Sequence, residues 1–235
     1  AKACVLLAHG LAEHTGRYDH VAARFNERGV AVVGPDHIGH GASPGVRVYL
    51  KTFSEYLEPM QALRAHIDDW YPGRPVFLMG HSMGGLISAH LLLLSQAAFQ
   101  GALLSGPAFH AVDPAPAPLM RIGRLLRYAL PKLGMVSLDA NGVSRDPAVV
   151  ADYIADPLVY NGKITTGLGT EILDAMDVAI ARAGEIKLPT YIAHGDADVM
   201  AGPEGSQAFF DALGADDKTL DFWPGLYHEI LNEPE

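Results

Sequence analysis

Short apolar runs alternate with helix-like segments along the chain, and this alternation limits the fold more than any other feature of the sequence. The runs are apolar at nearly every position, as is typical of strands that are covered on both faces of a sheet. They occupy Ala3–Ala8, Val30–Gly34, Pro75–Met79, Gly101–Ser105, Leu188–Ala193 and Lys218–Phe222. The alternation predicts βα units and an α/β fold with a mostly parallel sheet that is flanked by helices.

The segments between these runs carry helical periodicity and recognisable helix ends. One amphipathic helix is expected before Gly29, where a glycine can end it. A longer helix should begin at a capping box formed by Thr52 and Glu55 and stop before Pro72-Gly73.

The pattern changes after Ser105. Residues 106–185 hold no convincing strand, begin with the proline-rich segment 113–118 and carry two or three helical stretches. A gap of this length between sheet strands is uncommon unless it folds as a subdomain. We therefore predict a core made of residues 1–105 and 186–235, with residues 106–185 inserted as a helical cap.

The most specific motif is Gly80-His81-Ser82-Met83-Gly84, a G-x-S-x-G sequence between the run that ends at Met79 and a predicted helix. In this context the serine sits on a sharp turn that presents its Oγ above the sheet. The new helix directs the Met83 N–H toward a reacting carbonyl. We therefore predict Ser82 as a nucleophile and Met83 as an oxyanion donor, with the Leu11 N–H, after the first strand, as the second donor.

A serine nucleophile needs a base and a carboxylate that orients the base, and this motif is followed along the chain by the acid and then by a histidine. Asp196 and Asp198 both follow the run that ends at Ala193. We favour Asp198, because the chain has cleared the strand by then, and we interpret Asp196 as a turn former. His228 follows the last apolar run on a Pro-Gly loop and is the predicted base.

The chain also resembles the monoacylglycerol lipases, which have the α/β-hydrolase fold, over nearly its whole length. The resemblance rests on residues 9–18 (HGLAEHTGRY), 36–43 (DHIGHGAS), 77–85 (FLMGHSMGG), 153–157 (YIADP), 194–198 (HGDAD) and 227–228 (YH). It implies a triad of Ser82, Asp198 and His228, with Leu11 and Met83 as oxyanion donors. It further implies a cap over an acyl tunnel and a glycerol end shaped by Glu13, Arg17, His81 and Tyr153.

This resemblance implies hydrolysis of a monoacylglycerol to glycerol and fatty acid through an acyl-enzyme. Lysophospholipase-like proteins and general carboxylesterases share much of the pattern and remain alternatives. A non-catalytic lipid-binding module that uses the same pocket is a third, and labelling by a fluorophosphonate would distinguish it. Members of the family usually have further strands before residue 1 of this chain and a closing helix after the histidine. Since seven residues follow His228 here, we expect a sequence trimmed at one or both ends.

Some residues have two possible interpretations. Asp36, His37 and His40 lie close together, but the chemistry needs no metal or other cofactor, so we expect them to brace a loop. Glu13 and Arg17 lie four residues apart and could form an ordinary salt bridge at the start of a helix, or a polar network beside the oxyanion loop.

Composition limits the partners of the chain. A net charge of −10 argues against nucleic acid, and the single cysteine, Cys4, excludes an internal disulfide. No apolar stretch is long enough to span a bilayer, so a cytoplasmic protein is expected, and no feature indicates an oligomeric state. Residues 119–132 are both basic and very apolar, with the apolar set Leu119, Met120, Ile122, Leu125, Leu126 and Leu130. This stretch could make transient contact with lipid aggregates or a membrane surface, or could pack its apolar face on the core.

Overall fold

The computed structural model describes residues 1–112 and 117–234 of the chain. Most of the proline-rich segment, residues 113–116, lies outside the described residues, and so do the side chains of residues 117–119, including that of Leu119. The predicted contribution of Leu119 to an apolar helix face therefore concerns a side chain outside those that the structure describes.

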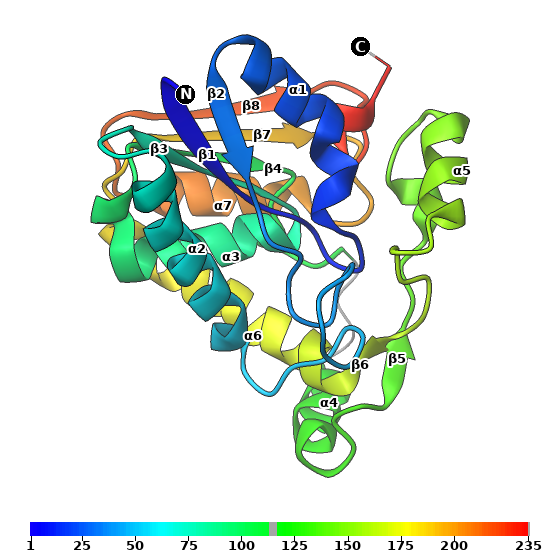
Figure 1. Cartoon of the computed structure of the whole chain (residues 1–235). Coiled ribbons are helices and arrows are strands. Elements are labelled where there is room, and N and C mark those ends of the chain that lie inside the picture. The colour runs from blue at the N-terminus through cyan, green and yellow to red at the C-terminus, as the bar shows by residue number, and fades with distance from the viewer. Residues whose placement is uncertain (113–116, 235) are drawn as a thin grey trace.

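Six parallel strands form the central sheet, in the order β2-β1-β3-β4-β7-β8 (Figure 1). They are β1 (Ala3–Ala8), β2 (Val30–Val33), β3 (Val76–His81), β4 (Gly101–Ser105), β7 (Thr190–Gly195) and β8 (Lys218–Trp223). Each strand lies on one of the six apolar runs of the sequence, with ends within two residues of those expected. The prediction of an α/β fold with a mostly parallel sheet is confirmed.

Seven α-helices are described: α1 (Asp19–Glu27), α2 (Leu57–Trp70), α3 (Met83–Ser95), α4 (Ala117–Ala129), α5 (Pro147–Ala155), α6 (Thr166–Arg182) and α7 (Pro203–Ala212). Short 3-10 turns lie at Thr15–Tyr18, Phe53–Tyr56, Gln96–Ala98, Ala140–Gly142, Ala183–Glu185 and Ile230–Asn232. The capping box at Thr52 and Glu55 is present, although it starts the 3-10 turn that leads into α2 rather than α2 itself. Within the described part of the chain, no helix combines the length and the apolar character that a bilayer crossing requires.

Alternate side chains of β1 enter two different parts of the core. Cys4, Leu6 and Ala8 join a large apolar cluster with residues of α2, α3, α6 and α7. Val5 and Leu7 join a smaller cluster with Tyr18 and residues of α1 on the opposite face. Because both faces of the inner strands are covered, these strands are apolar at successive positions, and this explains why they were visible in the sequence. The edge strand β8 differs, since most of its side chains are exposed and polar residues interrupt it.

The segment 106–185 differs from the sequence expectation in one respect. It contains a pair of short antiparallel strands, β5 (Gly134–Val136) and β6 (Ile164–Thr165), where no strand was predicted. Thr165 Oγ1 donates to Val48 O, which ties the pair to the core, and the Thr166 N–H donates to Leu133 O within the segment. Strands of two or three residues have too little periodicity for a sequence pattern to indicate them.

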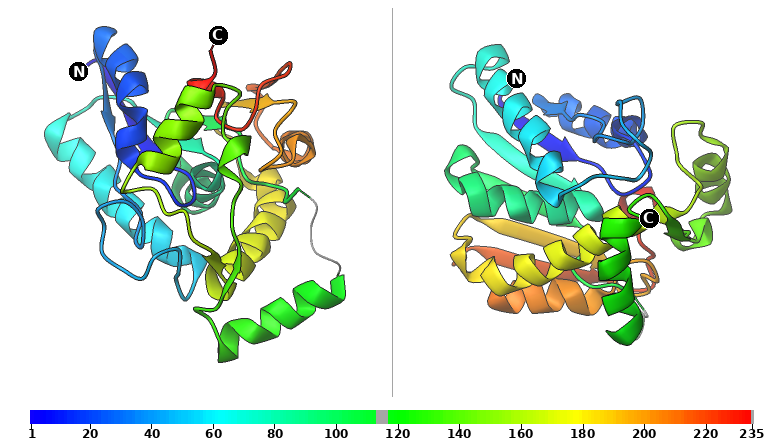
Figure 2. Two further views of the ribbon diagram at one scale, coloured as in Figure 1. Left: turned by 90° about the vertical axis from the view of Figure 1, so that its right-hand side faces the viewer. Right: turned by 90° about the horizontal axis from the view of Figure 1, so that it is seen from below.

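The three helices of this segment lie in two different places. α4 and α5 lie beyond the carboxyl ends of the sheet strands, outside the layer of core helices (Figures 1 and 2). α6 instead packs against α3 and α7, and its Leu168, Ile172, Ala175 and Ala179 belong to the main core cluster. The last helix of the predicted insertion therefore contributes directly to the core.

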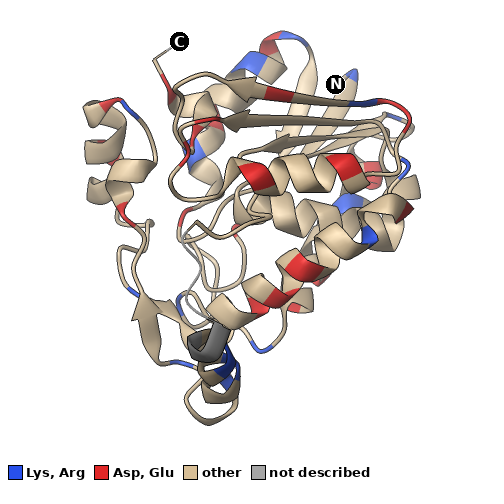
Figure 3. Ribbon diagram, turned by 180° about the vertical axis from the view of Figure 1, so that it is seen from behind, with Lys and Arg blue, Asp and Glu red and all other residues tan. Residues whose placement is uncertain are grey.

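Ion pairs join α4 to α6. Arg124 lies 2.8 Å from Asp174, and Arg127 lies 2.6 Å from Asp174 and 3.3 Å from Glu171. Figure 3 shows the basic positions of α4 next to acidic positions of α6. Arg124 and Arg127 are thus engaged with α6, whereas Arg121 is exposed. Arg127 also contacts the exposed Tyr128, since its Nη2 lies 3.0 Å from Tyr128 OH.

Candidate active site

Ser82 occupies a tight turn between β3 and α3. Its φ of 55° and ψ of −122° are values that a non-glycine residue adopts at a cost of about 1–3 kcal/mol. The flanking glycines make the turn possible, because a Cβ on Gly84 would collide with the carbonyl oxygen of Ala8 and one on Gly80 with that of Gly84. The strand, the sharp turn and the helix follow one another as the motif predicted.

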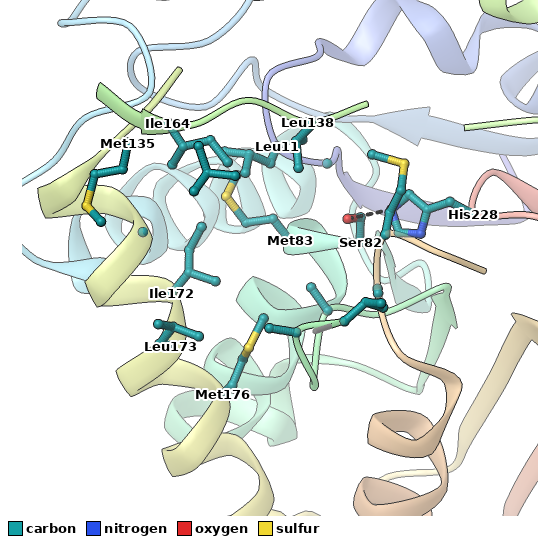
Figure 4. Close-up of a pocket in the computed structure, with 18 of the residues that line it drawn as sticks. Leu11, Ser82, Met83, Met135, Leu138, Ile164, Ile172, Leu173, Met176 and His228 are labelled. Carbon is teal, nitrogen blue, oxygen red and sulfur yellow. Dashed lines mark hydrogen bonds between the residues drawn. The ribbon is translucent and has the colours of Figure 1, made fainter. Parts of the chain in front are cut away.

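The turn brings Ser82 to His228, and His228 to Asp198. The Ser82 Oγ lies 2.8 Å from His228 Nε2 (Figure 4), and His228 Nδ1 lies 2.6 Å from Asp198 Oδ2. The serine and the histidine are 146 residues apart in sequence. This arrangement can pass a proton from the hydroxyl to the imidazole while the carboxylate orients the ring.

Four hydrogen bonds hold the carboxylate of Asp198. Oδ2 accepts from both His228 and His194, and Oδ1 accepts from the backbone N–H groups of Met200 and Ala201. Asp196 lies elsewhere: its Oδ1 accepts from the Gly225 N–H at the surface, 2.6 Å away. The structure therefore brings Asp198, and not Asp196, to the histidine.

The charges of the site favour a protonated His228 and an ionised Asp198. Burial lowers the pKa of His228, but the carboxylate of Asp198 and, more weakly, those of Glu229 and Glu13 outweigh burial, so that the pKa is raised overall. Burial raises the pKa of Asp198, but the charge of His228 and the hydrogen bonds that the carboxylate accepts hold this pKa well below its usual range. An ionised carboxylate in this position stabilises an imidazolium.

The loop after β1 lies directly beside Ser82. A Cβ on Gly10 would lie 3.3 Å from Ser82 Cβ, so the loop backbone and the serine are in close contact. The Gly10 N–H donates to Glu13 Oε1, 2.5 Å away, which fixes the start of the loop before Leu11. Met83 begins α3, and the N–H groups in the first turn of a helix have no partner within the helix. Leu11 and Met83 are thus both near the serine, as expected for oxyanion donors.

Arg17 connects two buried carboxylates, those of Glu13 and Glu229. Its guanidinium lies 2.8 Å from Glu13 Oε2 and 2.5 and 2.8 Å from the two oxygens of Glu229. It also lies over the ring of Tyr153, 4.6 Å from the centroid. Of the two interpretations of Glu13 and Arg17, the structure has a buried network beside the oxyanion loop.

A cavity of about 390 Å³ opens at Ser82 and is mostly apolar (Figure 4). Polar groups surround Ser82 and His228, among them Glu13, His81 and Glu229, with Tyr153 beside them. The apolar part of the wall includes Leu11, Met83, Met120, Met135, Leu138, Ile164, Ile172, Leu173 and Met176. Arg17, which the family resemblance placed among the residues that shape or contact the glycerol end, is not among the described residues that line the cavity, and its role there stays a prediction. Its guanidinium is engaged by two carboxylates, and these line the cavity in its place.

Comparison with known proteins places this geometry in a family. Residues 1–235 match the model of a hydrolase family described as serine aminopeptidase, S33. A monoacylglycerol lipase of Mycolicibacterium smegmatis is 40% identical over 231 residues, which cover 98% of this chain and 82% of that protein. The chain belongs to the monoacylglycerol lipase family.

Solved structures agree with membership of the monoacylglycerol lipase family and with the α/β-hydrolase fold. A monoacylglycerol lipase of Paleococcus ferrophilus has a TM-score of 0.90 at 34% identity, with 99% of this chain and 88% of that chain covered. A thermostable carboxyl esterase of Bacillus coagulans, solved in complex with glycerol, has a TM-score of 0.86 at 25% identity, with 98% and 84% covered. The predicted family and fold are confirmed.

In this family member, His81 has a defined hydrogen-bonding state. Burial and the charge of His228 lower the pKa of His81 to about 3, so the ring is neutral near pH 7. Nδ1 lies 3.0 Å from Ser105 O and must be the donor, because a carbonyl oxygen only accepts. The other ring nitrogen, Nε2, is therefore an acceptor. Since His81 lines the cavity, it could accept a hydrogen bond from a hydroxyl group.

The second motif of the family resemblance, residues 36–43, forms a braced loop behind the site. The carboxylate of Asp36 accepts from the backbone N–H groups of Thr15 and Ala42, and the His37 N–H donates to His9 Nε2. Across residues 1–112 and 117–234, no group of three or more His, Cys, Asp or Glu side chains is arranged to hold a metal ion.

Sequence reasoning missed two residues of the site. His194 Nε2 lies 2.9 Å from Asp198 Oδ2, and its Nδ1 lies 2.7 Å from Ser206 Oγ, so it supports the carboxylate from behind. Glu229 directly follows His228 and lines the cavity. Each residue had a signal in the sequence. His194 opens the His-Gly-Asp-Ala-Asp motif. Glu229 directly follows the predicted base, and a glutamate that is buried there needs a partner of opposite charge.

Proposed function

We propose that the protein hydrolyses monoacylglycerols to glycerol and a fatty acid, with Ser82 as the nucleophile. The observation that carries the proposal is the hydrogen-bonded series Ser82, His228 and Asp198 at one end of a mostly apolar cavity. The 40% identity to a monoacylglycerol lipase and the close structural match to another support the substrate class.

In the first half-reaction, His228 takes the hydroxyl proton of Ser82 as Oγ attacks the ester carbonyl. The carbonyl oxygen becomes an oxyanion, which would accept hydrogen bonds from the N–H groups of Leu11 and Met83. The tetrahedral intermediate collapses, the bond to the alcohol breaks, and His228 gives its proton to the departing alkoxide. Glycerol leaves, and the acyl group remains on Ser82.

In the second half-reaction, water replaces the alcohol. His228 removes a proton from the water as its oxygen attacks the acyl-enzyme. The second intermediate collapses with return of the proton to Ser82 Oγ, and the fatty acid is released. Asp198 remains ionised throughout and stabilises the imidazolium, in accordance with its low pKa.

The two ends of the cavity suit the two parts of a monoacylglycerol. The apolar wall along α6, which includes Ile172, Leu173 and Met176, would hold the acyl chain (Figure 4). The polar end would hold glycerol, with His81 Nε2 as an acceptor and Tyr153 beside it. Arg17 would act there indirectly, by orienting the Glu13 carboxylate.

We further propose that residues 106–185 act as a cap through which the protein meets lipid. On α4, Ile122, Leu125 and Tyr128 are 51%, 71% and 76% exposed. Met135 and Val136 are exposed as well and also line the cavity, so apolar surface continues from α4 to the cavity wall. A lipid aggregate or the surface of a membrane fits such a patch, and the protein would then be cytoplasmic with peripheral membrane contact.

The proposed function can be tested with Ser82→Ala. This variant should lose hydrolysis of a monoacylglycerol by at least about a thousandfold, together with labelling by a fluorophosphonate, because the nucleophile is gone. Circular dichroism should show an unchanged fold. Full turnover in the variant would place the nucleophile elsewhere, and a wild-type protein that neither turns over esters nor reacts with the probe would be a lipid-binding module.

A general carboxylesterase is the second candidate, favoured by the similarity to the carboxyl esterase of Bacillus coagulans. A panel of monoacylglycerols, p-nitrophenyl esters and lysophospholipids separates the possibilities. A monoacylglycerol lipase should show its highest kcat/KM on monoacylglycerols. Equal values for monoacylglycerols and simple esters would indicate a general esterase, and a preference for lysophospholipids would indicate a lysophospholipase.

A further inference from the structure

We propose that Glu229 is a positioning residue that acts through Arg17 to hold the loop of His228 against the loop of Leu11. The inference rests on the proposed ester hydrolysis, because it assigns a role to the neighbour of the proposed base. Glu229 would touch neither the substrate carbonyl nor the water. Its effect would be on where His228 lies and on how strongly His228 holds a proton.

The contact between Glu229 and Arg17 is two-pronged and buried. Nη1 of Arg17 lies 2.5 Å from Oε1 of Glu229, and Nη2 lies 2.8 Å from Oε2. The side chains are 11% and 5% exposed, so water does little to screen the pair. Two parallel hydrogen bonds fix both the distance and the plane of the two groups, and a single bond would not do so.

The same guanidinium continues to the oxyanion loop. Nη1 of Arg17 also lies 2.8 Å from Glu13 Oε2, and the side chain of Glu13 is 3% exposed. The other oxygen of Glu13 accepts from the Gly10 N–H and from Tyr18 OH. An unbroken series of charge-assisted hydrogen bonds thus runs from Glu229, the residue after His228, to Gly10, the residue before Leu11.

The loop of His228 is held from a second side by backbone bonds to the segment 106–185. The Glu229 N–H donates to Val143 O at 2.8 Å, and the His228 N–H lies 3.5 Å from Gly142 O. These bonds fix the position of the His228 loop relative to the cap. The side chain of Glu229 fixes the position of the same loop relative to the oxyanion loop. Loss of the side-chain contact should therefore let His228 shift with respect to the N–H groups near Ser82.

The charge of Glu229 should affect the pKa of His228, and a purely structural role would not do so. Two carboxylates share one guanidinium, so the cluster of Glu13, Arg17 and Glu229 carries a net charge of −1. The other groups that face His228 are Asp198, Ser82 and His81, whose ring centroid lies 4.7 Å away. His81 is neutral near pH 7, and the negative charges all favour protonated His228.

The direction of the pH effect follows from the role of the base. His228 must be neutral to take the proton of Ser82, so activity rises with pH through the pKa of His228. Glu229→Gln removes one negative charge and should lower this pKa. The acid limb of the pH–rate profile should therefore move to lower pH in the variant, even though its kcat at the plateau is smaller.

The test is Glu229→Gln in the full chain, with p-nitrophenyl butyrate as substrate between about pH 5 and about pH 9. This ester lacks a glycerol group, so an effect on head-group binding does not enter. We expect kcat to fall by roughly 10- to 100-fold, because a small misplacement of a reacting group lowers the rate by about this factor. KM should change less than kcat. Glu229→Asp, which keeps the charge but shortens the side chain, should lower kcat without moving the acid limb.

Glu233→Gln is the matched control. Glu233 lies four residues further on and is also buried, and it pairs with another arginine, since Arg145 Nε lies 3.0 Å away. It accepts from the Tyr227 N–H at 2.7 Å, so it supports the same loop without being part of the series that reaches Gly10. This variant should lower the melting temperature and leave the acid limb where it is in the wild type.

Three outcomes would overturn the inference. Wild-type kcat in both Glu229 variants would show that the contact positions nothing. Equal losses in Glu229→Gln and Glu233→Gln, with the acid limb unmoved in both, would reduce Glu229 to general support of the loop. A wild-type protein without esterase activity or fluorophosphonate labelling would remove the proposed function as well. The activity of the wild-type protein is measured before any variant is made, so this failure is distinguished from failure of the inference. If the wild type hydrolyses p-nitrophenyl butyrate but not a monoacylglycerol, the substrate proposal fails and the Glu229 variants still test the inference.

Discussion

At the scale of single residues, the site depends on a few side chains whose surroundings leave them one role each. Ser82 has a strained backbone that two glycines permit, and Asp198 has all its acceptor positions used by four hydrogen bonds. His81 has one nitrogen bound to Ser105 O, which leaves the other to accept. Single substitutions at such positions should have effects that differ sharply from those at their neighbours.

The first prediction compares the two aspartates of one loop. Asp198→Asn should lower kcat by roughly a thousandfold or more, because His228 loses the carboxylate that orients it. Asp196→Asn should change kcat little, since this side chain holds a surface turn through Gly225. Steady-state kinetics of both variants is the measurement, and a larger loss in Asp196→Asn would reassign the acid.

The second prediction concerns the alcohol end of the cavity. Wild-type kcat/KM should be higher for a monoacylglycerol than for the matched methyl ester, because a methyl group leaves buried polar groups unpaired at about 1–3 kcal/mol each. Tyr153→Phe should reduce this ratio by roughly tenfold, equivalent to the loss of one such hydrogen bond. Tyr160→Phe, in the same part of the chain, serves as the control. If the ratio of the two kcat/KM values is the same in Tyr153→Phe as in the wild type, Tyr153 does not contact the alcohol.

At the scale of elements, α4 is a helix with two different sides. Arg124 and Arg127 pair with acids of α6, and this orients the helix with Leu125 and Tyr128 toward solvent. Arg124 and Arg127 are therefore used within the fold, while Arg121 is exposed. What remains for a lipid surface is the exposed apolar side together with Arg121, so apolar burial more than charge should govern the contact.

The third prediction tests this element. Leu125→Ser combined with Tyr128→Ser should weaken binding to phosphatidylcholine vesicles by at least roughly tenfold, because burial of each side chain is worth about 1.5–3 kcal/mol. Hydrolysis of dissolved p-nitrophenyl butyrate should be unchanged. Trp70→Ser, which removes an exposed aromatic group from α2, is the control and should bind vesicles as the wild type does. Vesicle sedimentation measures the binding of the wild type, the double variant and the control. Equal binding of the double variant and the wild type would exclude α4 as the contact.

At the scale of the whole molecule, buried histidines make the fold sensitive to acid. His9, His37 and His40 lie in contact behind the oxyanion loop, with ring centroids of His9 and His37 4.1 Å apart. Burial lowers the pKa of His9, of His37 more strongly, and that of His40 to about 4. The folded protein therefore keeps these rings neutral at a pH at which the unfolded chain has already protonated them.

The fourth prediction follows from this difference. Below the unfolded pKa of about 6.5 the unfolded state binds more protons, so the free energy of unfolding should decline as the pH falls toward about 4. His40→Gln should make the decline less steep, while it lowers the melting temperature at neutral pH by removing buried contacts. His66→Gln, at an exposed position, should leave the slope unchanged. Thermal melts at several pH values measure the slopes, and identical slopes in His40→Gln and wild type would contradict the prediction.

The sequence by itself determined the sheet, the elbow and the order of the proposed catalytic groups. Strands covered on both faces are apolar at most positions, so the runs of the inner strands were visible without any contact information. The run of the edge strand β8 contains Lys218, Thr219 and Asp221 and is mostly exposed. The turn at Ser82 was visible because Gly80 and Gly84 are needed for local steric reasons. Such signals are carried by neighbouring residues, and these remain neighbours in any fold.

The tertiary structure alone decided which distant side chains meet. The sequence favoured Asp198 over Asp196, but the contact itself exists only because the fold brings His228, 30 residues away, to Asp198. Arg17 and Glu229 are 212 residues apart, and β5 and β6 pair although neither has a strand pattern of its own. α6 joined the core because α3 and α7 present apolar faces to it. No local periodicity encodes contacts of this kind, because they arise only when the packed sheet brings the ends of its strands together.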